Sequence, residues 1–456
     1  MKKKGSGKLK KVLLADALLA VVLVVALLFS GMQAKEKATE QKKQAEAEAV
    51  ALKEAQEKAK KEAGEKAIKE AEEAAIAAEQ KEAERRAAEQ AEAQRKAQEQ
   101  AEAERLAAEQ AEAERAAAEV TVRLTMGGDV LLSSTIDTVC ATDYGYDFSS
   151  LFANVAPYLE DYDLKIINEE TACGGPEFGI SGYPSFNAPH EAQDAMAYAG
   201  FNCICMASNH MLDMGTGPLN STLDYWRNAY PWMPTIGAYD SQEASDTIYY
   251  YEKEGFRIAI LNYTYGSNAG SGAYYDAPYA VNMLYEDEVR QDIRIAKENS
   301  DYVIVCPHWG TEYTHQYDES QAMWAQIFLQ EGVDLVLGTH PHVLQPLEQL
   351  TREDGHQMIV YYSLGNFVSN QDYAYTLVGG LADVTLRKTA DGVVVDDYGI
   401  IPIATHRSWY YSAYLLKDYS NDLAYASNPV LDGPSFTWEY ASDLVNSLYG
   451  DRLRNF

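Results

Sequence analysis

The sequence predicts an α/β fold with mixed sheets, preceded by an apolar N-terminal segment and a long helical stretch. Three observations lead to this prediction. Strand-like and helix-like segments alternate from Val120 onward, which is typical of α/β domains. Two of these segments, 247–266 and 381–403, read as hairpins, so antiparallel strands join the parallel ones. All 33 tyrosines follow residue 119, so only the later part of the chain has the aromatic content of a globular core.

The first segment reads as a membrane anchor. Six lysines precede an apolar run at residues 12–32, which Asp16 alone interrupts. About 20 apolar residues suffice to cross a bilayer, and lysines before the run favour a cytoplasmic N-terminus. We therefore expect a cytoplasmic basic tail at 1–11, a single transmembrane helix at 12–32 and an extracytoplasmic chain from residue 33 on. A cleaved signal peptide is the alternative, although the run is long for one.

Residues 33–119 read as a helical stalk. The segment is mostly Ala, Glu, Lys, Gln and Arg, without proline or aromatic residues. A ten-residue repeat over 78–117 places Glu three before Arg and Arg four before Glu, and such pairs support a lone helix. Large apolar residues are rare, and ten is not a multiple of 3.5. We expect one long helix that spaces the domain from the membrane. A partner-binding coiled coil is the alternative.

The globular region, residues 120–456, alternates in a regular order. Strands are expected at 120–132, 164–170, 201–210, 301–310, 333–343 and 357–367, besides the two hairpins. Helices are expected at 147–160, 190–200, 218–230, 285–300 and 318–332. The region has 15 Lys and Arg against 45 Asp and Glu. A field of that sign repels polyanions, so nucleic acid is not an expected partner.

Candidate metal ligands stand at the ends of the expected strands. They are Asp129, Asn168, Glu169, Glu170, Asn209, His210, His308, His340, His342 and Asn366. Ligand sites in α/β folds gather at the carboxyl ends of strands. In an extended segment residues i and i+2 point to one face, so His340 and His342 are expected to serve one site. Each motif alone is weak, because Asn, Gly and Asp are common in turns. Their ordered combination indicates a metal site.

These motifs resemble those of a known family. MGGDVLLSS, NEE, ASNHMLDMG, VCPHWGTEY, LGTHPHVLQPLE and YYSLGNFV look like the motif set of the CapA (PGA_cap) family, which is associated with bacterial poly-γ-glutamate capsule synthesis and export. The resemblance covers roughly Val120 to His406. It implies the four-layer α/β/β/α sandwich of the calcineurin-like metallophosphoesterases. It also implies a protein anchored in the bacterial cell membrane, whose partners are capsule-synthesis membrane subunits or an anionic polymer.

The resemblance also implies a ligand set. A divalent metal (Mn, Zn or Fe) would be held by Asp129, Glu170, Asn209, His308, His340 and His342. Metallophosphoesterases usually have a histidine where this chain has Leu131. If the superfamily geometry holds, one firm position would use Glu170, Asn209, His308 and His340. A second position, with Asp129, His342 and a share of Glu170, would be weak because leucine offers no lone pair.

Four further residues are candidates for supporting roles. His210, beside Asn209, is expected to donate a proton to a leaving group. The alternative is a structural histidine bonded to Asp213. Glu312 is a partner of a ligand or a substitute ligand, with a plain surface role as the alternative. Asn366 is either a turn residue or part of the site.

The chain has five cysteines. Cys203, Cys205 and Cys306 read as small core residues. Cys140 and Cys173 follow the first two strands at one edge of the sheet, and an extracytoplasmic compartment allows disulfides. We therefore predict a Cys140–Cys173 disulfide. Two free thiols are the alternative.

Two classes of function compete. The first is a metal-dependent hydrolase or transferase of the envelope that acts in capsule-polymer handling. The second is a non-catalytic component that binds polymer or partner subunits and keeps the metal site for structure. Leu131 favours the second class, whereas the remaining ligand set favours the first. A wall-spanning structural protein is a third alternative, supported by the stalk alone.

Overall fold

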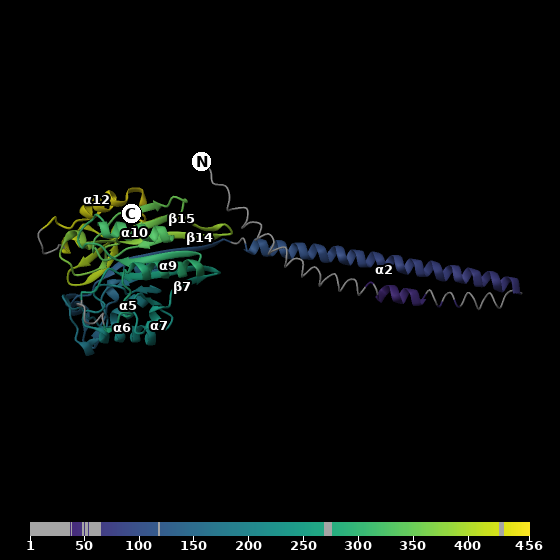
Figure 1. The fold of residues 1–456 in the computed structure, drawn as a ribbon, viewed down its shortest axis with the longest axis horizontal. Helices are drawn as coiled ribbons and strands as arrows, with labels where there is room; N and C mark the ends of the chain where they lie inside the picture. The colour runs from purple at the N-terminus through teal and green to yellow at the C-terminus, as the bar shows by residue number, and fades with distance from the viewer. Residues whose placement is uncertain are drawn as a thin grey trace. The chain divides into compact units, whose positions relative to one another are not determined.

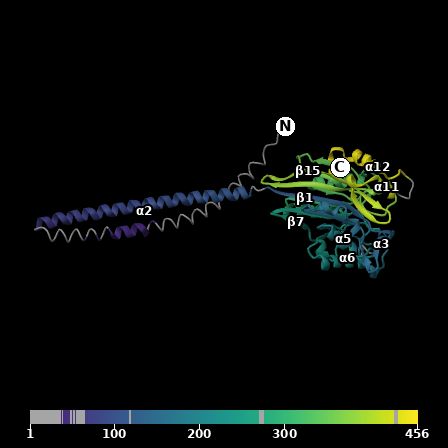
Figure 2. The ribbon, with the colours of Figure 1, turned by 180° about the vertical axis from the view of Figure 1, so that it is seen from behind.

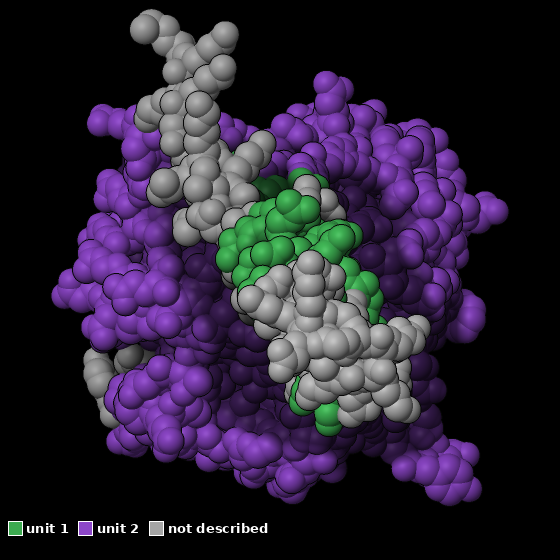
Figure 3. Space-filling view, turned by 90° about the vertical axis from the view of Figure 1, so that its right-hand side faces the viewer, with its two compact units in different colours: residues 1–119, 389–392 green, residues 120–388, 393–456 purple. Residues whose placement is uncertain are grey.

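The computed structural model describes residues 37, 39–47, 50, 53, 65–116, 119–268, 276–427 and 433–456. The chain divides into two compact units, coloured separately in Figure 3: a helical unit of residues 1–119 with 389–392, and a globular unit of residues 120–388 with 393–456. The expected basic tail at 1–11 and transmembrane helix at 12–32 lie outside the described residues. Within the described residues, no helix is long and apolar enough to cross a membrane.

In the helical unit, α2 (Glu65–Ala116) lies against helical residues 39–47 of the same chain, as Figures 1 and 2 both show. The Arg86 guanidinium donates a hydrogen bond to the Gln44 carbonyl at 3.3 Å. One straight helix would hold these residues about 63 Å apart. The prediction of a single long helix over 33–119 is therefore wrong for the described residues. Buried alanines, Ala45 on one segment and Ala93 and Ala97 on α2, allow the close approach. Ala93 and Ala97 are four residues apart, and the buried positions of α2 do not form a heptad repeat.

The larger sheet of the globular unit has the strand order β16-β15-β14-β1-β4-β5-β6, and β13 also pairs with β1. Strands β1, β4, β5 and β6 are parallel to one another, whereas β14 runs antiparallel to β1 and β16 runs antiparallel to β15. The bounds are β1 (Val120–Val130), β4 (Leu164–Glu169), β5 (Cys203–Cys205), β6 (Thr235–Ile236), β13 (Asn366–Val368), β14 (Val378–Thr389), β15 (Gly392–Arg407) and β16 (Tyr411–Leu415).

The smaller sheet has the strand order β11-β12-β10-β9-β8-β7. Its four central strands are parallel, and an antiparallel strand closes each edge. The bounds are β7 (Tyr249–Lys253), β8 (Phe256–Thr264), β9 (Tyr302–His308), β10 (Leu335–Leu337), β11 (Leu347–Thr351) and β12 (Gln357–Tyr361). A separate hairpin joins β2 (Ala141–Thr142) and β3 (Gly145–Tyr146). Both sheets are mixed, as predicted.

The helices begin and end where the local sequence allows. In α10 (Glu319–Glu331), Asp318 and Gln321 form a capping box, and Gly332 ends the helix in the left-handed conformation. The expected helix at 147–160 is instead a short 3₁₀ turn and α4 (Ala156–Leu159), because Pro157 cannot continue a helix from the residues before it. The other α-helices in the described part of the globular unit are α3 (Ser134–Cys140), α5 (Glu191–Tyr198), α6 (Thr216–Ala229), α7 (Gln242–Ser245), α9 (Glu286–Asn299), α11 (Asn421–Ala426) and α12 (Trp438–Tyr449).

Three buried clusters form the core of the globular unit. One contains apolar side chains from both sheets, among them Leu124 of β1 and Ile304 of β9. A second packs the larger sheet against α5 and α6, and a third packs the smaller sheet against α9 and α10, where Phe328 is fully buried. This packing holds the parallel strands of both sheets in place. Their carboxyl ends deliver the polar residues described next.

Candidate metal centre

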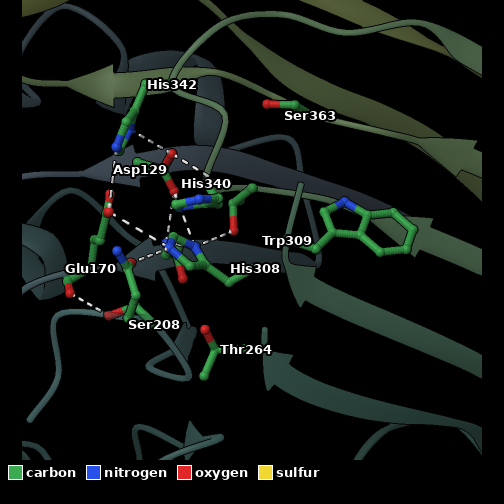
Figure 4. A network of polar contacts seen from close by, with 12 residues as sticks. Asp129, Glu170, Ser208, Thr264, His308, Trp309, His340, His342 and Ser363 are labelled. Atoms are coloured by element: carbon green, nitrogen blue, oxygen red, sulfur yellow. Dashed lines mark hydrogen bonds and ion pairs between the residues drawn. The ribbon is translucent and has the colours of Figure 1, made fainter. Parts of the chain in front are cut away.

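Polar side chains from both sheets meet at the carboxyl ends of β1, β4 and β9 (Figure 4). Asp129 is the penultimate residue of β1, and its Oδ1 lies 3.8 Å from the Nδ1 of His308, which ends β9. Glu170, directly after β4, places Oε1 at 3.6 Å from His308 Nε2. Asn209 Oδ1 lies 2.8 Å from the same Nε2. All four side chains are buried, so the structure brings these predicted ligands together.

His340 and His342 reach the same place from a turn after β10. Their backbones have φ of 96° and 58°, so the expectation that they lie in an extended segment is wrong. The turn still brings both rings to the cluster, with centroids 5.9 Å apart. His342 Nδ1 lies 3.2 Å from Asp129 Oδ2, and its Nε2 lies 3.6 Å from Glu170 Oε1. Positive φ is strained for residues other than glycine, and such strain clusters at functional sites.

The chemistry of the donors fits a divalent cation. Donor atoms of Glu170, His340 and His342 all lie within 4.8 Å of one another. Among the described residues, both carboxylate oxygens of Glu170 and the Nδ1 of His340 are buried without a hydrogen-bond partner. Buried polar atoms are nearly always paired, so orphaned donor atoms that converge indicate a ligand. Carboxylate and imidazole together suit Mn, Zn or Fe.

The electrostatics of the cluster agree with this fit. Burial lowers the pKa of His308 and His340, and the neighbouring imidazoles lower it further, so both rings are neutral and keep a lone pair for a metal. Burial raises the pKa of Glu170 well above its usual value, and the charge of His342 opposes that rise. Burial alone would lower the pKa of His342, but Glu170 and Asp129 outweigh it and raise the pKa to about 9. The cluster thus accommodates positive charge beside its two carboxylates.

Two neighbours outside the expected ligand set hold the ligands in place, and only Asn168 was among the strand-end candidates of the sequence. Asn168 donates a hydrogen bond to Asp129 Oδ1 at 2.8 Å. Thr339 Oγ1 lies 3.0 Å from His308 Nδ1 and so orients that ring. Asn168 was visible as a strand-end residue in the NEE motif. Thr339 had only its place before His340 as a signal.

The supporting residues predicted from sequence divide between the cluster and its entrance. Asn366 Oδ1 lies 3.0 Å from His342 Nδ1, so Asn366 belongs to the site. His210 Nδ1 lies 2.8 Å from Asp213 Oδ2, which fixes the ring. A cleft of ≈ 420 Å³ opens beside the cluster and is lined by His210, His342, Glu312 and Leu131, among others. Leu131 is buried there and offers no ligand atom, because a leucine side chain has no lone pair.

The predicted Cys140–Cys173 disulfide is absent. Both residues are buried free cysteines, as are the other three. The Cys173 thiol lies 3.8 Å from the Thr171 carbonyl. Burial first, and the charge of Glu169 next, raise the pKa of Cys173 well above its usual value. The thiol is therefore engaged by neighbours on its own loop rather than by Cys140.

The family model described as bacterial capsule synthesis protein PGA_cap matches residues 123–371, more than half of the chain. The chain belongs to the PGA_cap family. All predicted metal ligands lie inside the matched range. Two curated proteins are similar to the chain. The capsule biosynthesis protein CapA of Bacillus anthracis is 28% identical over 283 residues, which cover 59% of this chain and 65% of that protein. The PGA biosynthesis protein CapA of Bacillus subtilis (strain 168) is 31% identical over 209 residues, which cover 46% and 52%.

The matches thus span about two thirds and about half of the length of these two relatives. Among solved structures, the chain is similar to the NAD nucleotidase NadN of Haemophilus influenzae, with a TM-score of 0.40 and 10% identity over 74% of this chain and 64% of that one. It is also similar to a putative 5'-nucleotidase from Staphylococcus aureus, with a TM-score of 0.36 and 15% identity over 72% and 59%.

Proposed function

We propose that this PGA_cap protein is a metal-dependent hydrolase or transferase of the cell envelope that acts on the capsule polymer, poly-γ-glutamate. One observation carries the proposal: orphaned, buried donor atoms of Glu170 and His340 converge with His342 beside an open cleft. A site kept only for packing has no reason to leave such atoms without a hydrogen bond. The proposed fold is the four-layer sandwich of the calcineurin-like metallophosphoesterases, supported by the core cluster that both sheets share.

The chain's own residues would divide the work as follows. Glu170, Asn209, His308 and His340 would hold the firm cation, and Asp129 and His342 a weak second one. A bound divalent cation lowers the pKa of water and stabilises charge on a phosphoryl or carbonyl oxygen. His210 lines the cleft with its Nδ1 tied to Asp213, so its Nε2 is the nitrogen available to give a proton to a leaving group.

The decisive experiment combines metal analysis with turnover. Full-length protein, purified without chelator, should contain one tightly held equivalent of Mn, Zn or Fe. It should hydrolyse at least one member of a panel of phosphodiesters and γ-glutamyl peptides. His308→Ala should lose most of the metal and the activity, whereas Asp129→Ala should lose only a weaker equivalent. Two tightly held equivalents would show that another residue replaces the missing histidine. A wild type without metal after reloading would end the hydrolase proposal.

A non-catalytic binding component is the second candidate, and Leu131 favours it. Loss of one ligand of four weakens the second metal position on which two-metal hydrolysis depends. Metal content without turnover on any panel member would select this candidate. In both cases the capsule-synthesis membrane subunits remain the proposed partners.

The proposed location is outside the cell membrane, with residues 12–32 as the anchor. This proposal rests on the lysines that precede the apolar run. Protease added to cells stripped of wall should cut within residues 33–119. Full protection of the globular unit would refute this topology.

A further inference from the structure

One buried side chain, that of Asn262 in β8, joins the two sheets next to the metal ligands. Its Oδ1 accepts hydrogen bonds from the backbone N–H of Ala207 at 2.6 Å and of Met206 at 2.9 Å, both just after β5 of the larger sheet. Its Nδ2 donates a hydrogen bond to the Cys306 carbonyl, in β9 of the smaller sheet, at 2.7 Å. A carboxamide accepts and donates in one rigid group, so Asn262 links three backbone groups of two sheets at once.

Both linked segments lead directly into a predicted metal ligand. Ala207 lies two residues before Asn209, and Cys306 lies two residues before His308. These ligands meet, since Asn209 Oδ1 lies 2.8 Å from His308 Nε2. The firm metal position proposed above takes two ligands from the larger sheet and two from the smaller one. The spacing of the sheets at this point therefore sets the size of that position.

The segment that carries Asn209 has left the ladder of its own sheet. The Met206 N–H still donates to the Ile236 carbonyl at 2.9 Å, but β5 has already ended at Cys205. The Asn209 carbonyl accepts a second link, from the N–H of the exposed Asn268, at 2.8 Å. The bonds of Asn262 differ from that link because they are buried and reach the strand of His308. A buried backbone group that loses its partner is costly, so the bonds of Asn262 resist displacement.

The backbone beside Asn262 leaves room for its amide. Gly237 follows β6 with φ of 89°, a conformation that favours glycine. A Cβ at this position would lie 2.2 Å from Asn262 Oδ1 and 2.7 Å from the Ala207 Cβ. A side chain at 237 would therefore push the amide away from Ala207. The amide occupies a space that the glycine keeps open.

We propose that Asn262 is a positioning residue of the metal centre, whose carboxamide fixes the spacing of Asn209 and His308 across the two sheets. The inference rests on the proposed function, since it takes a divalent cation as the occupant of the cluster. Asn262 itself is not a ligand. It acts through the backbone two residues before each of two ligands.

The test measures how Co²⁺ binds to full-length protein freed of metal by chelator. Co²⁺ takes carboxylate and imidazole ligands, and its visible absorption depends on the geometry of those ligands. Asn262→Leu removes all three hydrogen bonds without adding charge. It should weaken Co²⁺ binding at least about tenfold, as loss of a group that orients ligands does, and should change the absorption spectrum of the bound ion.

Asn262→Asp serves if the leucine variant does not fold. An aspartate keeps the two accepted bonds but, when ionised, cannot donate to the Cys306 carbonyl. Its negative charge by itself favours a cation, so the spectrum rather than the affinity is the readout, and the spectrum should again differ from that of the wild type.

Lys253→Met is the matched control. The Lys253 ammonium, on β7, also links the two sheets, through the Thr121 carbonyl at 2.9 Å and Asp163 Oδ1 at 2.6 Å. These partners lie at the amino ends of β1 and β4, the ends away from the metal ligands. This variant loses a link between the sheets but should keep the wild-type affinity and spectrum.

Three results would count against the inference. Wild-type affinity and spectrum in the Asn262 variants would leave the metal centre standing and remove the positioning role. An equal change of spectrum in Lys253→Met would show that any weakening between the sheets disturbs the site. A wild type that does not bind Co²⁺ would refute the metal centre of the proposed function, and the inference with it.

Discussion

Removing the imidazole of His340 should abolish the stabilisation that a cation gives to the globular unit. His340 Nδ1 is one of the orphaned donor atoms of the cluster. A cation at one hundred times its dissociation constant stabilises the native state by about 2.7 kcal/mol. For a region of this length the entropy of unfolding is about 0.7 kcal/mol/K, so the midpoint of thermal unfolding should rise by about 4 °C. In His340→Ala the rise should fall below about 1 °C at the same metal concentration.

Differential scanning calorimetry of each variant, with chelator and then with Mn, Zn or Fe, measures this shift. The comparison is made within one variant, so any loss of basal stability cancels. His356→Ala serves as the control, because this half-buried histidine lies outside the cluster and bonds to the Val333 carbonyl. It should keep the full shift. A metal-dependent rise that persists in His340→Ala would refute the assignment of His340. Absence of a rise in the wild type with all three metals would refute the metal centre itself.

Four further outcomes are expected. Burial raises the pKa of the Asp137 carboxyl to about 7 in the folded protein, whereas in the unfolded chain it is about 3.9. The free energy of unfolding should therefore decrease by up to about 4 kcal/mol as the pH rises from 4 to 7. Urea titrations at several pH values should show that Asp137→Asn weakens this pH dependence of the free energy of unfolding. An unchanged pH dependence would contradict the assignment to Asp137. Asp213→Asn should lower kcat about 10- to 100-fold by releasing His210 while metal content stays constant; a parallel loss of metal would indicate a wider collapse. Thiol titration of the unfolded, unreduced protein should find all five cysteines free, and three would reinstate a disulfide. Spin labels at Gln44 and Arg86 should report a short distance, and about 63 Å would instead restore one straight helix.

Much of the fold could be predicted because its strands have a strong local signal. Residues 302–305 of β9 and 359–361 of β12 are all Val, Ile or Tyr. The hairpin β7–β8 lies within its expected range, and β14–β15 overlaps the expected 381–403 but extends beyond it at both ends. The helix expected at 147–160 failed at Pro157. The strand β16 and the helices α11 and α12 were not predicted. β16 and α11 are short, and α12 mixes polar with aromatic residues.

The candidate site was predictable as a set of residues but not as a geometry. Strand ends identified Asp129, Glu170 and His308, because parallel strands bring their carboxyl ends to one edge. The turn at His340 and His342 was not predictable, since a positive φ in two histidines contradicts local preference and is imposed by the surrounding structure. The burial of alanines in the helical unit was missed for a related reason. Alanine is common in any helix, so a row of alanines does not predict that the chain folds back on itself.

The backbone at His340 and His342 sets function against stability. Each left-handed residue costs about 1–2 kcal/mol when it has a side chain, and glycine would relieve that cost. A laboratory selection for thermostability alone would therefore favour glycine at these two positions and discard the donors. A selection for bound metal would restore the histidines and the strain together. The turn at residues 340–342 thus lowers the stability of the fold while it positions the metal ligands. The size of this cost is the difference in stability between chains selected for thermostability alone and chains selected for bound metal.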